Sequence, residues 1–141
     1  MTVAENIELV KQATEAYNNG GARAFADYMD DSVLDYMPNG REPLKGKDAF
    51  IEDNMAFAKI FTDLKAEITN IFGQDDWVCI QGIMTARHSG PFMLYNGKEI
   101  HPKGKSIRIP ISNVIKLKDG KIVEIHEYFD QMTFMTQLDT T

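Results

Sequence analysis

The spacing of apolar residues predicts helices in the first part of the chain. Within residues 1–17, residues of one apolar face recur at three- and four-residue steps, as in an amphipathic helix. Its positions are Val3, Ile7, Val10, Thr14 and Tyr17. Thr2 and Glu5 have capping-box spacing at its start, and "NNGG" (18–21) ends it. A short second helix is expected to bury Phe25, Tyr28 and Met29, and a third, over about 48–61, to bury Phe50, Met55, Phe57 and Phe61.

The pattern changes after residue 63, where segments rich in Ile, Val, Thr and aromatic residues predict strands. These segments are 64–73, 76–88, about 105–118 and 121–130, and "DDSVLDYMP" predicts an earlier strand ended by Pro38. "GQDD" and "KDGK" join neighbouring strands as tight turns. A last short helix is expected over 131–138. Helices followed by antiparallel strands favour one α+β domain over 1–141, with the N-terminal helices packed on one face of a curved antiparallel sheet.

Strand alternation decides which side chains can face an interior pocket. In 105–118 one face is almost entirely isoleucine and includes Asn113, which either is satisfied near a bulge or binds a ligand. In 121–130 one face carries Ile122, Glu124, His126, Tyr128 and Asp130, and the other carries Val123, Ile125, Glu127 and Phe129. Periodicity alone slightly favours burial of the second set. If the first set faces the pocket instead, burial raises the pKa of Asp130 and makes it a usable acid or base.

Composition and charge exclude several classes of function. The chain has 141 residues and a net charge of -6, so no nucleic-acid partner is expected, and the basic segment "HPKGKSIR" is interpreted as a solvated loop. Cys79 is the only cysteine, which excludes an internal disulfide. No metal-ligand spacing, signal peptide or apolar run of about 20 residues is present. We therefore expect no metal, no membrane partner and a cytoplasmic location.

Several short motifs resemble the SnoaL-like polyketide cyclases, within the nuclear transport factor 2-like superfamily. They are "ARHSGPF", "PKGKSI" and "KLKDGKIVEIHEYFDQMTFMTQL", preceded by "PLKGKDAF", and together they cover nearly the whole chain. The family typically reads G-T-H-x-G-x-F, P-x-G-K, D-G-K-I-x-E-x-W-x-x-x-D and Q-L-G. The resemblance implies a cone-shaped α+β barrel of the nuclear transport factor 2-like (cystatin-like) type. It also implies a homodimer through the outer sheet face, and a last strand whose polar face looks inward.

The resemblance also assigns candidate residues one by one. Asp130 matches the family's acid/base Asp, and His88 matches the His of the G-T-H motif. His126 stands where the family usually has Trp, and Tyr36 stands near a position often held by His. Asn113 falls in a segment that supplies polar pocket groups. Ala86-Arg87 in place of Gly-Thr, and "QLD" in place of "QLG", depart from the pattern and leave the substrate and reaction open.

These observations lead to one expected function and two alternatives. The expectation is a cofactor-free cyclase, isomerase or related lyase that acts on a small, largely apolar polyketide- or terpenoid-like substrate. Its expected catalytic residues are Asp130, His126 and His88, and its expected substrate-contacting residues are Tyr36, Asn113, Tyr128, Asn54, Phe50 and Trp77. The alternatives are a non-catalytic small-molecule-binding module of the same fold and a structural dimerisation domain.

Overall fold

The computed structural model describes residues 1–94 and 96–139, in which the predicted helices and strands occur in the predicted order, together with three two-residue strands that the residue pattern does not predict. The elements are α1 (Val3–Gly20), α2 (Ala22–Ala26), β1 (Met29–Tyr36), β2 (Leu44–Lys45), α3 (Lys47–Ile60), β3 (Phe61–Gln74), β4 (Trp77–His88), β5 (Phe92–Met93), β6 (Glu99–Ile100), β7 (Ser106–Lys118), β8 (Lys121–Phe129) and α4 (Gln131–Asp139). Within this part of the chain, no helix is both long and apolar enough to cross a membrane.

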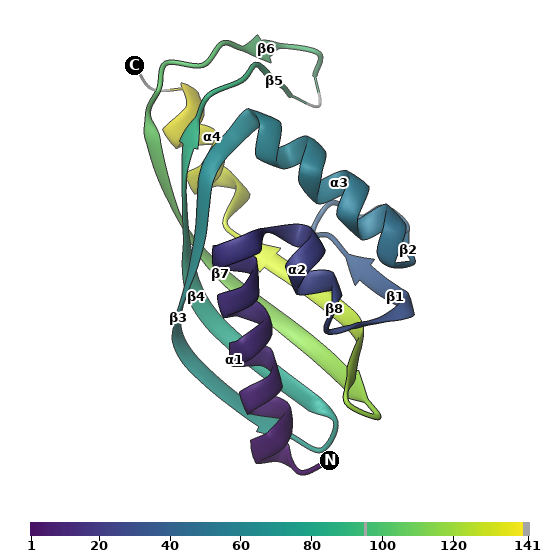
Figure 1. Cartoon of the computed structure of the whole chain (residues 1–141). Helices are drawn as coiled ribbons and strands as arrows, with labels where there is room; N and C mark the ends of the chain where they lie inside the picture. Colours follow the sequence, from purple (N-terminus) through teal and green to yellow (C-terminus); the bar gives the residue numbers. More distant parts are fainter. Residues whose placement is uncertain (95, 140–141) are drawn as a thin grey trace.

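The main sheet has six strands in the order β2-β1-β8-β7-β4-β3. It curves around α1, α2 and α3, which all cover one face (Figure 1). We call this the inner face and the opposite one the outer face. The expected α+β class is therefore confirmed, with two differences. The sheet is mixed, because β1 runs parallel to β8, and it does not close into a barrel, because β2 and β3 remain as its edges.

Local sequence signals account for the helix boundaries. The Thr2 hydroxyl accepts a hydrogen bond from the Glu5 N–H at 3.1 Å, and the Glu5 carboxylate accepts one from the Thr2 N–H at 3.4 Å, which completes the expected capping box. Gly21 ends α1 with a φ of 78°, a backbone conformation that favours glycine. The second helix is shorter than expected, and Met29 begins β1 instead of continuing it.

Two apolar clusters stabilise the fold. The first packs the inner face against α1, α2 and α3, with Val10, Phe50, Ile80 and Ile125 among its buried members. The second cluster lies at the other end of β3, β4 and β7, where α4 and the β5–β6 ribbon cover the sheet. It is rich in aromatic rings that contact one another edge-on or tilted, such as Phe61 and Phe134 at 5.4 Å. Side chains of the second cluster therefore fill the space between the sheet and its covering elements at the end near α4.

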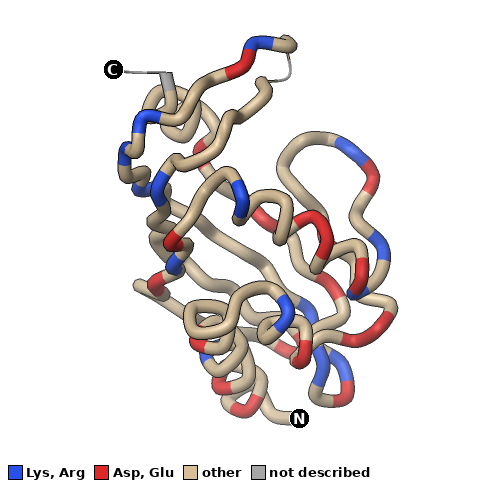
Figure 2. The backbone as a smooth tube through the Cα atoms, turned by 45° about the horizontal axis from the view of Figure 1, so that its top comes forward, with Lys and Arg blue, Asp and Glu red and all other residues tan. Residues whose placement is uncertain are grey.

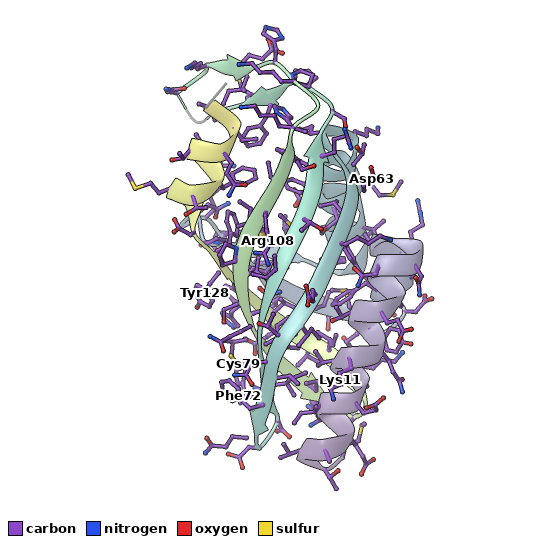
Figure 3. The ribbon with its side chains drawn as sticks, turned by 90° about the vertical axis from the view of Figure 1, so that its left-hand side faces the viewer. Lys11, Asp63, Phe72, Cys79, Arg108 and Tyr128 are labelled. Carbon is purple, nitrogen blue, oxygen red and sulfur yellow. The ribbon has the colours of Figure 1, made fainter. Side chains whose placement is uncertain are left out.

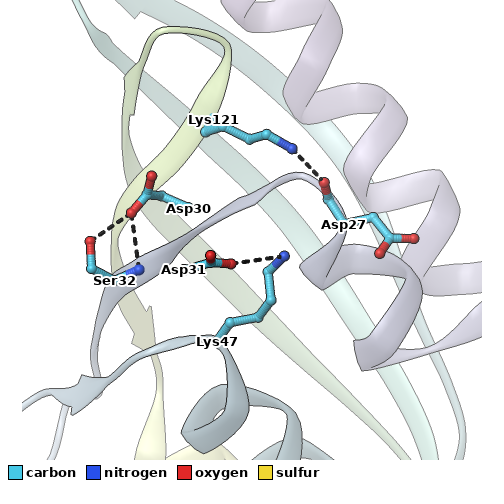
Figure 4. Close-up of polar contacts among 6 residues, drawn as sticks. All are labelled: Asp27, Asp30, Asp31, Ser32, Lys47 and Lys121. Atoms are coloured by element: carbon cyan, nitrogen blue, oxygen red, sulfur yellow. Dashed lines mark hydrogen bonds and ion pairs between the residues drawn. The ribbon is translucent and has the colours of Figure 1, made fainter.

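The start of β1 is tied to its neighbours by polar contacts at the surface (Figure 4). The Asp30 carboxylate accepts hydrogen bonds from the Ser32 N–H and hydroxyl at 2.9 and 2.6 Å. Lys47 at the start of α3 pairs with Asp31 at 3.6 Å, and Lys121 at the start of β8 donates to the Asp27 carbonyl at 3.0 Å. Figure 2 shows further acidic residues along α1, the helix next to the N-terminus. These contacts fix β1, the strand that carries Asp35.

Candidate active site

Two carboxyl groups lie on the inner face of the sheet among apolar residues. Asp35 on β1 pairs with Ile125 on β8, and Ile125 belongs to the first apolar cluster. Glu127 follows two positions later on the same face of β8 and stands opposite Asn113 on β7. Paired residues of neighbouring strands share a face, so β1, β7 and β8 bring Asp35, Glu127 and Asn113 together. We call Asp35 and Glu127 the carboxyl pair.

Asp35 is the more enclosed member of the carboxyl pair, with 1% of its surface exposed. Neither of its carboxylate oxygens has a hydrogen-bond partner among the described residues. Two ionised carboxylates only accept hydrogen bonds, so the pair can form one only when it holds a proton. Burial raises the pKa of Asp35 above its usual value, and the Asp53 charge adds to this rise, whereas the neighbouring Glu127 carboxyl, as a potential donor, and the charge of His126 oppose it. Asp35 therefore needs a donor, and Glu127 is the neighbour able to supply one.

Glu127 is partly accessible, unlike Asp35, yet its carboxyl group is poorly solvated. Burial is the main cause that raises the pKa of Glu127 well above its usual value, and Asp35 and Asp53 raise it further. No lysine or arginine in the described part of the chain lowers the pKa of either carboxyl. A carboxyl group with a raised pKa can donate and accept a proton near neutral pH, which is what acid/base catalysis needs.

Tyr17 faces this region from the last turns of α1. Burial, and secondarily the Glu127 charge, raise the pKa of the Tyr17 phenol to about 12, so it remains a neutral hydrogen-bond donor at neutral pH. Its ring contacts Phe25 edge-on, with centroids 6.3 Å apart. The neighbouring Asn18 side chain bonds both the N–H and the carbonyl of Ala66, each at 2.8 Å. These two hydrogen bonds fix the end of α1, and with it Tyr17, against β3.

A pocket of about 390 Å³ opens beside Tyr17, between the end of α1, α2, α3 and the start of β3. Asn54 of α3 and Phe61 and Leu64 of β3 line it together with Tyr17. The Asn54 amide donates to the Phe50 carbonyl at 2.9 Å, which leaves its oxygen available. The volume suits a small organic molecule. Tyr17 lines the pocket and also lies close enough to Glu127 for the Glu127 charge to act on its phenol, so Tyr17 connects the pocket to the carboxyl pair, although neither carboxyl lines the pocket.

Asp130 does not lie in this interior, and the expectation that it is poorly solvated is wrong. Its side chain is exposed and caps α4. The carboxylate accepts hydrogen bonds from the Thr133 N–H at 3.0 Å and the Thr133 hydroxyl at 2.8 Å, and these bonds lower its pKa. The carboxylate thus satisfies orphan donors at a helix start. A catalytic role for Asp130 stays a prediction, and Asp130 is not among the residues that line the pocket.

The expectation that the polar face of β8 looks inward is also wrong. A bulge at Val123 shifts the register, because Leu117 pairs with Ile122 whereas Lys116 pairs with Glu124. Ile122 is consequently buried, while His126 and Tyr128 lie on the outer face. Figure 3 shows Tyr128 there, on the side of the sheet away from α1.

The remaining expected site residues on the outer face surround His126. The Tyr36 ring stacks on the His126 ring at 4.3 Å, and Trp77 lies tilted against it at 5.9 Å. Glu124 contacts the His126 Nε2 at 3.1 Å. This outer-face aromatic cluster and Tyr128 are separated from the carboxyl pair by the sheet itself. These residues cannot contact a substrate bound beside Tyr17.

His88 and Phe50 lie inside the protein but have different surroundings. His88 is 3% exposed in the second cluster, stacked on Phe61 at 5.2 Å, and its Nε2 has no partner among the described residues. It lies eight residues along β4 from Ile80, the strand neighbour of Asn113, which is about 26 Å in an extended strand. Phe50 is buried in the first cluster and stacks on Phe25 at 5.7 Å. Three of the expected site residues lie on the same side of the sheet as the carboxyl pair. Asn54 lines the pocket, Asn113 stands opposite Glu127, and Phe50 belongs to the first cluster.

Glu127, Asp35 and Tyr17 were missing from the expected site, although each left a signal in the sequence. Glu127 is the one charged residue between Ile125 and Phe129, and Asp35 alternates with Val33, so each is polar in an apolar series. Tyr17 ends the apolar stripe of α1 with a hydroxyl group. Among the described residues, no cluster of His, Cys, Asp and Glu could hold a metal ion.

Comparisons with known proteins agree with this architecture. A sequence profile of the SnoaL-like polyketide cyclase family matches residues 7–138. A candidate SnoaL-like polyketide cyclase from Jannaschia sp. CCS1 superposes with a TM-score of 0.83 at 21% identity, covering 98% of this chain and 94% of that one. AclR of Streptomyces galilaeus, a candidate hydroxylase, gives a TM-score of 0.82 at 22% identity, covering 97% of each chain. No curated protein matches the chain.

A third structure identifies the fold type. A nuclear transport factor 2-like protein of unknown function from Burkholderia pseudomallei K96243 superposes with a TM-score of 0.78 at 14% identity, covering 99% of this chain and all of that one. The fold type that the sequence motifs imply is therefore confirmed, as a curved sheet that stays open.

Proposed function

Since the chain belongs to the SnoaL-like polyketide cyclase family, we propose that it is a cofactor-free enzyme that moves protons on a small, largely apolar substrate. The substrate would be polyketide- or terpenoid-like and would bind in the pocket beside Tyr17. The observation that carries the proposal is the carboxyl pair, poorly solvated on the inner face with the pKa of both members raised.

In this proposal Glu127 is the acid/base group, because it is the accessible member of the carboxyl pair. A C–H bond next to a substrate carbonyl breaks, its proton goes to a Glu127 oxygen, and the electron pair forms an enolate. Glu127 then returns the proton to another carbon or to oxygen. The negative charge moves from the Glu127 carboxylate to the enolate oxygen, and the apolar surroundings that raise the pKa of Glu127 make its carboxylate a stronger base for this step.

Tyr17 and Asn113 would orient the substrate in the same reaction. The Tyr17 phenol stays protonated at neutral pH, so it can donate a hydrogen bond to the enolate oxygen. Asn113, opposite Glu127, offers both a donor and an acceptor. Neither group needs to change its protonation during the reaction. This arrangement suits cyclisation, isomerisation or dehydration of a carbonyl compound.

The test measures proton exchange and needs no knowledge of the natural substrate. The protein is incubated in D2O with a panel of aromatic and cyclic 1,3-diketones, and deuterium uptake next to the carbonyl is followed by mass spectrometry. Glu127→Gln should slow the enzyme-dependent exchange by about a hundredfold or more. Asp130→Asn, the same kind of change at the exposed aspartate, should keep the wild-type rate.

Two other results would contradict the proposal. Loss of exchange in Asp130→Asn with full activity in Glu127→Gln would return the acid/base role to Asp130. Absence of exchange with every diketone, together with binding of one of them, would favour the non-catalytic small-molecule-binding module.

We also propose that the protein forms a homodimer through the outer face. The support is the exposure there of Phe72 and Tyr128, at 53% and 52%, beside the outer-face aromatic cluster. Figure 3 shows Phe72 and Tyr128 on the face that no helix of α1–α3 covers. An apolar, aromatic sheet face of this kind is typical of an interface between copies.

A further inference from the structure

The two members of the carboxyl pair differ in access, which separates their roles. Asp35 is 1% exposed, and it lies on β1 beside the first apolar cluster, where α3 packs on that strand. Glu127 remains partly accessible. Neither carboxyl lines the pocket beside Tyr17, but Glu127 keeps some exposed surface, whereas Asp35 has almost none. Asp35 nevertheless stands on the strand next to Glu127 with both carboxylate oxygens unpartnered. A carboxyl group buried in this way has to act through its neighbour.

We propose that Asp35 is a positioning residue that shares a proton with Glu127 and so sets the protonation state in which Glu127 meets the substrate. This inference rests on the proposed function, since it gives the Glu127 acid/base group its partner. Two neighbouring carboxyl groups in an apolar interior do not both ionise readily, because each charge opposes the other. The carboxyl pair then carries one proton and one negative charge in the resting enzyme.

The single proton lets one oxygen of Glu127 work in both directions. With the proton on Asp35, Glu127 is a carboxylate that takes a proton from substrate carbon and leaves both carboxyl groups neutral. With the proton on Glu127, the same group is an acid, and Asp35 is the carboxylate that accepts its hydrogen bond. The proton passes between the two by moving along that hydrogen bond, so no other group has to supply or remove it.

The groups around the pair favour this arrangement. Asp53 of α3 is a third negative group that opposes ionisation of both carboxyls, and Tyr17 of α1 is a neutral donor near Glu127. Asn113 of β7 is uncharged. Among the described residues, His126, on the opposite face of β8, is the one basic residue that acts on Asp35, and it favours the ionised form. The negative charge of the singly protonated pair therefore resides more readily on Asp35 than on Glu127.

The experiment follows the carboxyl carbons by NMR in the intact protein labelled with ¹³C at aspartate and glutamate. Asp35→Asn should increase the acidity of Glu127 about tenfold, a shift of about one pH unit in its titration midpoint, because the opposing charge is gone and the amide donates to the Glu127 carboxylate. Asp31→Asn is the matched control on the same strand, with a side chain 98% exposed and 3.6 Å from Lys47. It should leave the Glu127 titration unchanged.

The wild-type protein gives a second measurement in case Asp35→Asn does not fold. Each carbon of the carboxyl pair should show two titration steps, since the two groups share protons. A single step at each carbon, or a Glu127 midpoint that Asp35→Asn leaves in place, would overturn the inference. Neither result depends on turnover. Failure of the diketone exchange would reject the proposed function without affecting this titration.

Discussion

Two aspartates near strand ends, Asp35 and Asp130, have opposite environments and opposite chemical consequences. Asp35 is enclosed without hydrogen-bond partners, and burial raises its pKa. Asp130 is exposed and accepts two hydrogen bonds from Thr133, which lower its pKa. A group with a lowered pKa holds its charge and is a poor base near neutral pH. The local surroundings therefore favour the interior carboxyl pair, and not Asp130, for proton transfer.

The raised pKa of Glu127 predicts that this residue lowers stability as pH rises. Below about pH 4 the carboxyl is protonated in both the folded and the unfolded chain and has no effect. Above that pH the unfolded chain ionises first, so the free energy of unfolding falls until the pH passes the folded-state pKa. Glu127→Gln removes this titration. It should raise the melting temperature by roughly 3–8 °C near pH 7 and have little effect at pH 4.

Calorimetry or circular dichroism at several pH values measures this difference. Glu67→Gln is a suitable control, because Glu67 is exposed on β3. Its difference from the wild type should not grow with pH. An equal melting temperature for Glu127→Gln and the wild type at pH 7 would show that Glu127 ionises as an ordinary surface carboxylate.

At the scale of elements, residue patterns predict where helices and strands lie better than which way a strand faces. The strands expected over 76–88 and about 105–118 match β4 and β7 within one residue, and the inward isoleucines of β7 are confirmed. In β8 the bulge at Val123 adds one residue and exchanges the two faces from Glu124 onward. Strand periodicity contains no signal for one extra residue, since pairing with β7 determines it.

The carboxylate of Asp130 is expected to stabilise the start of α4. Asp130→Ala removes the acceptor for the Thr133 N–H, so α4 should fray. Amide hydrogen exchange at Thr133 and Phe134 should then become about threefold faster or more. Because the cap acts through the ionised carboxylate, wild-type protection should also fall as the pH drops through the lowered pKa of Asp130.

Met132→Ala is the control for this measurement, because Met132 lies in the same turn and is 80% exposed. Its exchange rates should match those of the wild type. Unchanged exchange in Asp130→Ala would show that the carboxylate does not stabilise α4, and would leave Asp130 free for another role.

At the scale of the whole molecule, the outer face is expected to join two copies. Phe72→Glu places a charge in the exposed aromatic part of that face, which should weaken association by about tenfold or more. Light scattering after size exclusion should then give the monomer mass at concentrations where the wild type is a dimer. Met132→Glu, a similar change on α4, should remain dimeric. A monomeric wild type would contradict the homodimer.

The resemblance in the sequence motifs identified the architecture but not the site. The order of helices and hairpins is enough to specify this fold, whereas the site depends on which polar residues are turned inward. Asn113 was expected on the inner face and lies there, opposite Glu127. The alternation of Asp35 with Val33 is a weak signal on its own, because the burial of Asp35 arises only when β1 inserts parallel to β8 and α3 packs on β1. Contacts between distant segments supply that information.

In the proposed reaction the acid/base group is Glu127, on the inner face of the sheet, and not Asp130. The most direct test compares the titrations of Glu127 and Asp130 in the wild-type protein by ¹³C NMR of their carboxyl carbons. We expect the Glu127 midpoint to lie well above its usual value of about 4.3 and the Asp130 midpoint to lie below its usual value of about 3.9. An ordinary or lowered midpoint for Glu127, with a raised one for Asp130, would contradict the claim.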